Sequence, residues 1–239
     1  MKISIHQPNY LPYPGFFAKV LASDVFVVYD TAKFTRGDYI NRNKIRSFSE
    51  AKFLWLTLPV GKKDFSKTPI SRVLVTDEKV FSRHSRIIRT NYLKAPFFDE
   101  DVCRMVSVSH ASIADHNIFL INSLITKLKI NVKVVLASQL GIPIRAGTEG
   151  LIDIVKALQG NEYVSGIGAK DYLKPELFKK ESIALTFINY SPLRYNQIHP
   201  GFVENMSIID AAFNVGWENL IERLNFCVSK NLKSGALVL

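Results

Sequence analysis

The sequence predicts an α/β fold with a mainly parallel or mixed sheet, flanking helices and a more helical C-terminal half. Short apolar runs rich in β-branched and aromatic residues indicate strands buried on both faces, most clearly residues 25–29 (VFVVY). These runs alternate with segments whose apolar residues recur at helical spacing, such as residues 80–92, and this alternation is typical of a parallel sheet. No internal repeat or low-complexity linker divides the sequence, so residues 1–239 are expected to form a single domain.

Strands are expected at short apolar runs, most of which end at a proline, a glycine or a polar residue. Residues 70–76 (ISRVLVT) are included because apolar and polar residues alternate there with the period of two that a half-exposed strand shows. The expected strands are residues 2–6, 25–29, the end of 31–46, 52–58, 70–76, 132–138, 163–165 and 183–190.

Helices are expected where the apolar period lengthens, and several have signals at their ends. Pro14 suits a first helical turn, Ser112 with Asp115 approximates a capping box, and Thr148 is an expected N-cap. The expected helices are residues 13–23, 78–92, 98–108, 112–128, 148–158, 174–180, 207–213 and 217–228, with 217–239 forming a helical tail.

Composition excludes several classes of protein. At 47% hydrophobic and 22% charged residues, the chain can bury a large core and has no signature of disorder. No apolar run approaches the roughly 20 residues that span a bilayer, and the N-terminus has no signal-peptide pattern, so a cytoplasmic protein is expected. Two cysteines are too few for a disulfide framework, and neither they nor the histidines have metal-ligand spacing. No metal or cofactor is therefore expected.

The formal charge of +10 lies in one quarter of the chain. Residues 31–94 contain 15 lysines and arginines against 5 acidic residues, whereas the charges balance before residue 31 and again after residue 94. A concentrated positive field attracts anions such as nucleotide phosphates, an acidic protein or a nucleic acid. A solvated basic face that only aids solubility is the alternative.

The loop after the first strand is the first candidate site. Pro8 and Pro12 stiffen it, and in α/β sheets ligands bind at the carboxyl ends of strands. A neutral imidazole is a useful general base, so a histidine at this edge is a candidate catalytic residue. The alternative is a packed N-terminal strand followed by an ordinary polar loop. The polar side chains of the loop are His6, Gln7, Asn9 and Tyr10.

Further polar groups follow other expected strands. Asp30 ends the second strand. In the segment Asn41-Arg42-Asn43-Lys44, strand alternation would send the two amides to one face and the two cations to the other. Arginine can hold a phosphate or a carboxylate bidentately, and amides can position a sugar or a base. A solvated strand edge is the alternative for this segment.

Two later segments complete the candidate set. The expected strand 163–165 ends at Ser165 and opens onto Gly166-Ile167-Gly168, whose glycines would let a ligand approach the backbone, although the spacing fits neither a P-loop nor a dinucleotide fingerprint. A tight turn explains it equally well. Tyr195 and Gln197 form a polar pair before the last helices, where Ser207 and Asp210 fit helix capping.

Together these segments resemble the WbqC-like protein family. The resemblance rests on HQPNYLPYPGFF, YDTAKFTRGDYINRNKI, LTLPV, YVSGIGAKDYL, the Tyr195/Gln197 pair and SIIDAAFNVG, which occur in the same order over about residues 1–216. Tyr13 stands where the family often has Trp, and residues 31–37 match more loosely. The resemblance implies a product of bacterial O-antigen or surface-polysaccharide gene clusters, with a suggested role in transferring glycine or another aminoacyl group to an amino sugar.

From the residues and the resemblance together, the predicted protein is an acyl or aminoacyl transferase that forms an amide on a nucleotide-linked amino sugar. In this hypothesis His6, Asn9 and Asp30 are catalytic, with His6 as the base. The predicted substrate-binding residues are Gln7, Tyr10, Asn41, Arg42, Asn43, Lys44, Ser165, Gly166, Tyr195 and Gln197. The donor would arrive already activated, on an acidic carrier protein or an aminoacyl-tRNA held by residues 31–94.

Two other classes of function stay open at this point. One is a non-catalytic module that binds a nucleotide sugar for a neighbouring enzyme. The other is a nucleic-acid binder, which is disfavoured because residues 31–94 contain no signature of the common RNA-binding modules.

Overall fold

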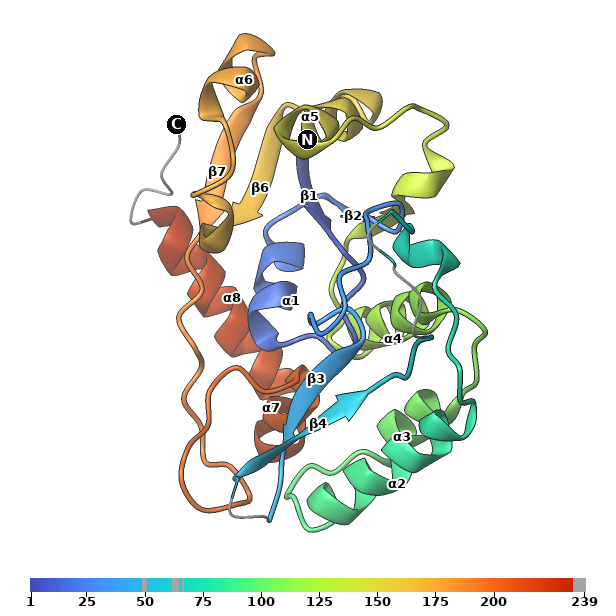
Figure 1. Ribbon diagram of the computed structural model, residues 1–239. Helices are drawn as coiled ribbons and strands as arrows, with labels where there is room; N and C mark the ends of the chain where they lie inside the picture. Colours follow the sequence, from blue (N-terminus) through green and yellow to red (C-terminus); the bar gives the residue numbers. More distant parts are fainter. Residues whose placement is uncertain (49–50, 62–64, 66, 234–239) are drawn as a thin grey trace.

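The computed structural model describes residues 1–48, 51–61, 65 and 67–233. Its centre is a five-stranded sheet with the strand order β5-β2-β1-β6-β7, in which every neighbouring pair is parallel. Helices cover the sheet, and a separate antiparallel ribbon, β3-β4, lies in the lower half of the view in Figure 1. The α/β class predicted from the sequence is confirmed, including the more helical C-terminal half.

The strands are β1 (Lys2–His6), β2 (Val25–Val28), β3 (Arg42–Arg46), β4 (Phe53–Thr57), β5 (Lys133–Leu136), β6 (Glu162–Gly166) and β7 (Ala184–Ile188). The α-helices are α1 (Pro14–Leu21), α2 (Lys79–Tyr92), α3 (Glu100–Ser107), α4 (Ile113–Lys127), α5 (Gly147–Ala157), α6 (Pro175–Lys180), α7 (Ile208–Val215) and α8 (Trp217–Lys233). Short 3₁₀ turns are η1 (Ile70–Arg72), η2 (Ala137–Gln139) and η3 (Ile167–Ala169).

The sheet is buried on both faces, as the continuous apolar strands predict. On one face, alternate residues such as Ile3 and Ile5 pack with α5 and α6. On the other face, Phe26 and Val28 join a larger core that includes α1 to α4, α7 and α8. Because successive strand residues point to opposite faces, β1 contributes Ile5 to the first core and turns His6 toward Phe16 of α1.

The basic part of the chain is an insertion between β2 and β5. These strands are neighbours in the sheet, yet about 100 residues separate them in sequence, and the intervening chain forms β3, β4 and α2 to α4. In Figure 1 the ribbon and α2 lie in the lower half of the view, below the parallel sheet. The charge excess of residues 31–94 is therefore concentrated to one side of the parallel sheet.

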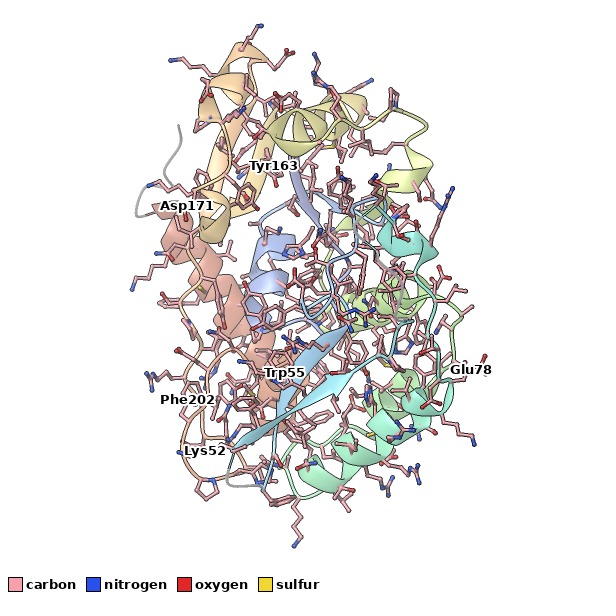
Figure 2. All side chains as sticks on the ribbon, in the orientation of Figure 1. Lys52, Trp55, Glu78, Tyr163, Asp171 and Phe202 are labelled. Atoms are coloured by element: carbon pink, nitrogen blue, oxygen red, sulfur yellow. The ribbon has the colours of Figure 1, made fainter. Side chains whose placement is uncertain are left out.

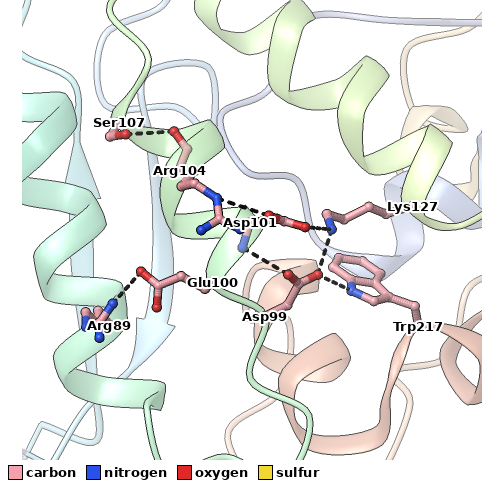
Figure 3. A network of polar contacts seen from close by, with 8 residues as sticks. All are labelled: Arg89, Asp99, Glu100, Asp101, Arg104, Ser107, Lys127 and Trp217. Atoms are coloured by element: carbon pink, nitrogen blue, oxygen red, sulfur yellow. Dashed lines mark hydrogen bonds and ion pairs between the residues drawn. The ribbon is translucent and has the colours of Figure 1, made fainter.

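A polar network joins the insertion to the C-terminal helix α8 (Figure 3). Asp99 caps α3 by accepting a hydrogen bond from the Asp101 amide. Its carboxylate also accepts from Lys127 Nζ of α4 at 2.7 Å and from Trp217 Nε1 of α8 at 2.9 Å. One partly buried carboxylate thus fixes the start of α3 against two other helices.

Two local predictions are wrong. Residues 70–76 form no named strand: they begin with η1, and Ile70 and the C-cap residue Val73 are both buried three positions apart, because side chains at i and i+3 eclipse in a 3₁₀ turn. Leu74 and Val75 form only isolated bridges, with Ser112 and Val60. Thr148 does not cap α5, whose N-cap is Ala146; the Thr148 hydroxyl instead accepts a hydrogen bond from the Lys174 amide. The predicted Ser112 cap of α4 is confirmed, since its hydroxyl accepts from the Asp115 amide at 3.0 Å.

At the C-terminus, the expected helical tail is α8 as far as Lys233, and residues 234–239 lie outside the described part of the chain. None of the helices in that described part is both long enough and apolar enough to cross a bilayer.

Candidate functional site

A cleft of about 770 Å³ opens at the carboxyl edge of the parallel sheet. From β1 the chain proceeds outward through β2 and β5, and β6 then returns to the other side of β1. The strand order therefore reverses between β1 and β6, and ligands of open α/β sheets bind outside the strand ends at such a switch point. His6 ends β1 and Gln7 follows it, Ser165 and Gly166 end β6, and all four line this cleft.

Aromatic side chains form much of the cleft wall. Six of the nine tyrosines of the chain line it, together with Phe16. Tyrosine offers a large apolar ring and a polar hydroxyl, so such a wall suits a ligand with both flat and hydroxylated parts. Tyr163 of β6, labelled in Figure 2, is one of them. The six are Tyr13, Tyr29, Tyr39, Tyr163, Tyr172 and Tyr190.

Lys19 of α1 brings a buried amine to the cleft. The residue is only 6% exposed, lines the cleft, and donates from Nζ to the Ile5 carbonyl oxygen at 2.9 Å. No carboxylate of the described residues lies within ion-pair distance of it. Burial without a counter-ion lowers the pKa of Lys19 to about 7. A substantial fraction of this amine is therefore uncharged at neutral pH and able to accept a proton.

His6 lies next to this amine with a defined tautomer. Its Nδ1 is 2.9 Å from the Gln7 carbonyl oxygen, and because a carbonyl only accepts hydrogen bonds, Nδ1 holds the proton and Nε2 is the free acceptor. Burial, reinforced by the nearby Lys19 charge, lowers the pKa of His6 to about 3. The imidazole is therefore neutral throughout the physiological range and is a weaker proton acceptor than Lys19.

Buried amides hold the loop after β1 in its shape. Asn43 Nδ2 donates to the Tyr10 and Leu11 carbonyl oxygens at 3.2 and 2.7 Å. Asn117 Nδ2 donates to the Pro8 carbonyl oxygen at 2.8 Å. Leu11 has a φ of 41°, a left-handed conformation that a branched side chain rarely adopts. These contacts keep the strained loop in place and position Asn9, which lines the cleft.

Several residues predicted to form the site lie elsewhere. Asp30 is buried and accepts a hydrogen bond from the Ser138 amide, which ties the ends of β2 and β5. Tyr10 is buried, with its hydroxyl 2.8 Å from His84 Nδ1. Asn41 is also buried and donates to the Leu58 carbonyl oxygen. These three side chains, like that of Asn43, bond to the protein itself and do not line the cleft.

Arg42 and Lys44 project from the outer face of the ribbon, opposite to the two asparagines. The Arg42 guanidinium carbon lies 4.2 Å from the centre of the Trp55 ring, and Lys44 Nζ lies 5.3 Å from that of Phe53. The alternation predicted for this segment is therefore confirmed. Neither cation lines the cleft, although Tyr39, whose ring is 6.0 Å from that of Trp55, does.

Tyr195 and Gln197 belong to a buried network around Asp210 of α7. The Asp210 carboxylate accepts hydrogen bonds from the Tyr195 hydroxyl, the Gln197 amide and the Tyr92 hydroxyl, each at 2.7 or 2.8 Å. Burial raises the pKa of Asp210, and these three donors oppose the rise. The pair thus joins the loop after β7 to α7 and α2, and neither residue lines the cleft.

Ser165 and Gly166 both line the cleft, but they differ in how closely other atoms surround them. Ser165 is buried and bonds to the Tyr163 hydroxyl. A Cβ added at Gly166 would meet no atom within 4 Å, so packing does not require glycine there. Gly15, at the start of α1, differs: an added Cβ would lie 2.7 Å from Tyr190 Cδ1 and closer still to the Tyr13 ring.

Comparison with known proteins assigns the chain to a family. The sequence model of the WbqC-like protein family matches residues 7–222, nearly the whole chain. The chain belongs to the WbqC-like protein family. The uncharacterized protein Rv1507c of Mycobacterium tuberculosis is 31% identical over 223 residues, which cover 91% of this chain and 95% of that relative. The resemblance inferred from the sequence is thereby confirmed.

In this WbqC-like chain, sequence reasoning missed Lys19 and most of the aromatic wall. One signal for Lys19 was present, since it is the single charged residue of the apolar helix α1 (PGFFAKVL). A lone lysine in such a segment either reaches solvent or is buried for a reason. Asp38 and Tyr39 also line the cleft, but they follow no strand of the sheet, and only the fold of the insertion brings them there.

Proposed function

We propose that this member of the WbqC-like family is an acyl or aminoacyl transferase of bacterial O-antigen or surface-polysaccharide biosynthesis. It forms an amide between a pre-activated acyl group, carried as a thioester or as an aminoacyl ester of RNA, and the amine of a nucleotide-linked amino sugar. The observation that carries the proposal is the buried Lys19 amine beside His6 in the cleft at the switch point. An amine nucleophile must lose a proton as it forms an amide, and this site offers an acceptor.

The reaction needs one proton transfer in each direction. The sugar amine attacks the carbonyl carbon of the activated acyl group, so a C–N bond forms and a tetrahedral oxyanion develops. Uncharged Lys19 takes the proton from the attacking nitrogen, and the C–S or C–O bond to the carrier then breaks. The protonated Lys19 returns its proton to the departing thiolate or alkoxide. A pKa of about 7 suits both transfers.

Other cleft residues have supporting roles in this proposal. His6 accepts a hydrogen bond at Nε2 from the acceptor sugar and, remaining neutral, does not compete for the proton. Asn9 and backbone N–H groups near Gly166 stabilise the oxyanion. The tyrosine wall packs against the sugar and its base. Asn41 is not included among the oxyanion donors, because its amide is bonded to Leu58.

The test is incubation of the protein with a panel of nucleotide-linked amino sugars and carrier- or RNA-linked acyl donors, followed by mass spectrometry of the sugar. The expected result is the mass gain of one acyl group with at least one pair. Lys19→Met should lower the transfer rate by at least about 100-fold, the typical contribution of a general base. Lys133→Met, at an exposed position on β5, is the matched control and should keep the wild-type rate.

No mass gain with any pair would refute the transferase proposal. If the protein bound a nucleotide sugar tightly and transferred nothing to it, the non-catalytic binding module would take its place. Transfer at the wild-type rate by Lys19→Met would keep the reaction and reject Lys19 as its base.

A further inference from the structure

The outer face of the β3–β4 ribbon gathers aromatic rings and basic side chains. In the antiparallel register Lys44 stands opposite Trp55, and Arg42 stands opposite Thr57, so these side chains share one face of the ribbon. Arg42 lies over the Trp55 ring, and Lys44 lies within 6 Å of the centres of both the Trp55 and Phe53 rings. No acidic side chain in the described part of the chain lies within ion-pair distance of either cation.

This face is accessible and leads into the cleft. Trp55 is 39% exposed and Tyr39 is 38% exposed, and Figure 2 labels Trp55 on the ribbon. The Tyr39 ring contacts Trp55 on one side and lines the cleft on the other. A chain-like ligand lying on the ribbon could therefore extend past Tyr39, so that its end would reach Lys19 and His6.

The chemistry of the face fits nucleobases and phosphates better than carboxylates. An acidic protein surface needs only cations as binding partners. On this face, large aromatic rings lie next to the cations. Single-stranded nucleic acids bind by stacking bases on aromatic rings and guanidinium planes while nearby cations hold the phosphates. The net charge of +10 in residues 31–94 adds the long-range attraction that such a polyanion requires.

We propose that the outer face of the ribbon, formed by Arg42, Lys44, Phe53 and Trp55 and continued by Tyr39, binds single-stranded RNA. The second part of the inference rests on the proposed function: the bound RNA is the carrier that brings the activated acyl group, and its 3′ end enters the cleft past Tyr39. In this proposal the activated acyl group arrives on RNA and not on an acidic carrier protein.

Binding is tested by fluorescence anisotropy with a labelled, unstructured 12-nucleotide RNA. Single-stranded DNA of the same sequence, an RNA duplex and polyglutamate are the comparison ligands. Single-stranded RNA should bind most tightly, and the logarithm of its affinity should fall linearly with the logarithm of the salt concentration. Ultraviolet crosslinking with mass spectrometry should place the RNA on peptides that contain Tyr39 or Trp55, a readout that needs no variant.

Variants separate stacking from general charge. Trp55→Ala should weaken binding roughly 5- to 150-fold, the range that one base stacked on an aromatic ring provides. Lys44→Gln should lower the salt slope by about 0.7, the value for one phosphate contact to a single strand. Arg86→Gln removes the same charge from an exposed position on α2 and should leave the affinity within about twofold of wild type. Melting curves establish that each variant is folded.

The proposal is overturned if DNA, duplex RNA or polyglutamate binds as tightly as single-stranded RNA, or if folded Trp55→Ala keeps the wild-type affinity. Its failure is distinguishable from failure of the proposed function. Acyl transfer from a protein-bound thioester without RNA binding would sustain the transferase and refute the RNA platform. RNA binding at Trp55 without transfer from any donor would sustain the RNA-binding face and refute the transferase.

Discussion

Replacement of Asn43 by alanine should destabilise the protein by about 2–4 kcal/mol. Asn43 is 1% exposed, and its amide satisfies the carbonyl groups of Tyr10 and Leu11 while its Oδ1 accepts from the Lys44 amide. Each buried polar group left without a partner costs about 1–3 kcal/mol. Relaxation of the strained Leu11 backbone recovers part of this cost, so the total lies below the sum.

Urea unfolding, followed by circular dichroism, measures this loss, and the melting temperature should fall by at least about 4 °C. Asn122→Ala, at an exposed position on α4, is the matched control and should change stability by less than about 0.5 kcal/mol. A ligand-contacting role for Asn43 predicts the opposite pattern, with lost affinity and unchanged stability. Wild-type stability in Asn43→Ala would therefore refute the reasoning that the amide holds the loop.

Two further predictions concern acid and the cleft wall. Burial lowers the pKa of His84 to about 4 and that of His116 to about 3, whereas an unfolded histidine titrates near 6.5; the unfolded chain therefore binds more protons at pH 5. The free energy of unfolding, measured in urea, should therefore fall by about 2 kcal/mol per histidine between pH 7.5 and 5. A free energy of unfolding that does not change over this range would show that these histidines are not buried in the neutral form. Gly15→Ala should cost about 1–3 kcal/mol, because the added methyl group overlaps two tyrosine rings of the cleft wall. Gly166→Ala meets no atom within 4 Å and should be nearly neutral, so equal urea midpoints for the two variants would refute this account of the wall.

The sequence could predict the edge of the sheet at which the cleft lies. Apolar runs mark the strands, polar residues mark their ends, and parallel strands share one carboxyl edge. His6 and Gly166 could therefore be placed together although 160 residues separate them. The sequence did not contain the strand order, so the switch point between β1 and β6 was known only from the structure.

The same patterns could not distinguish a polar side chain that faces a ligand from one that faces the protein. Asn43 and Gln197 are polar groups beside strands or loops, as site residues are, yet their partners are a carbonyl 32 residues away and a carboxylate 13 residues away. Lys19 is the opposite case, because it belongs to an apolar helix and yet lines the cleft. Its burial depends on how α1 packs against the end of β1, which no local pattern specifies.

The most direct test of the central claim is the titration of Lys19 itself. Lysine labelled with ¹³C at Cε gives a resonance that reports the charge of each amine, and Lys19→Met identifies the relevant one. A midpoint at about pH 7, shifted by a nucleotide-linked amino sugar, is predicted because the amine is buried in the cleft and no carboxylate of the described residues lies within ion-pair distance of it. A midpoint near the ordinary lysine value of about 10.4, unchanged by such ligands, would contradict it.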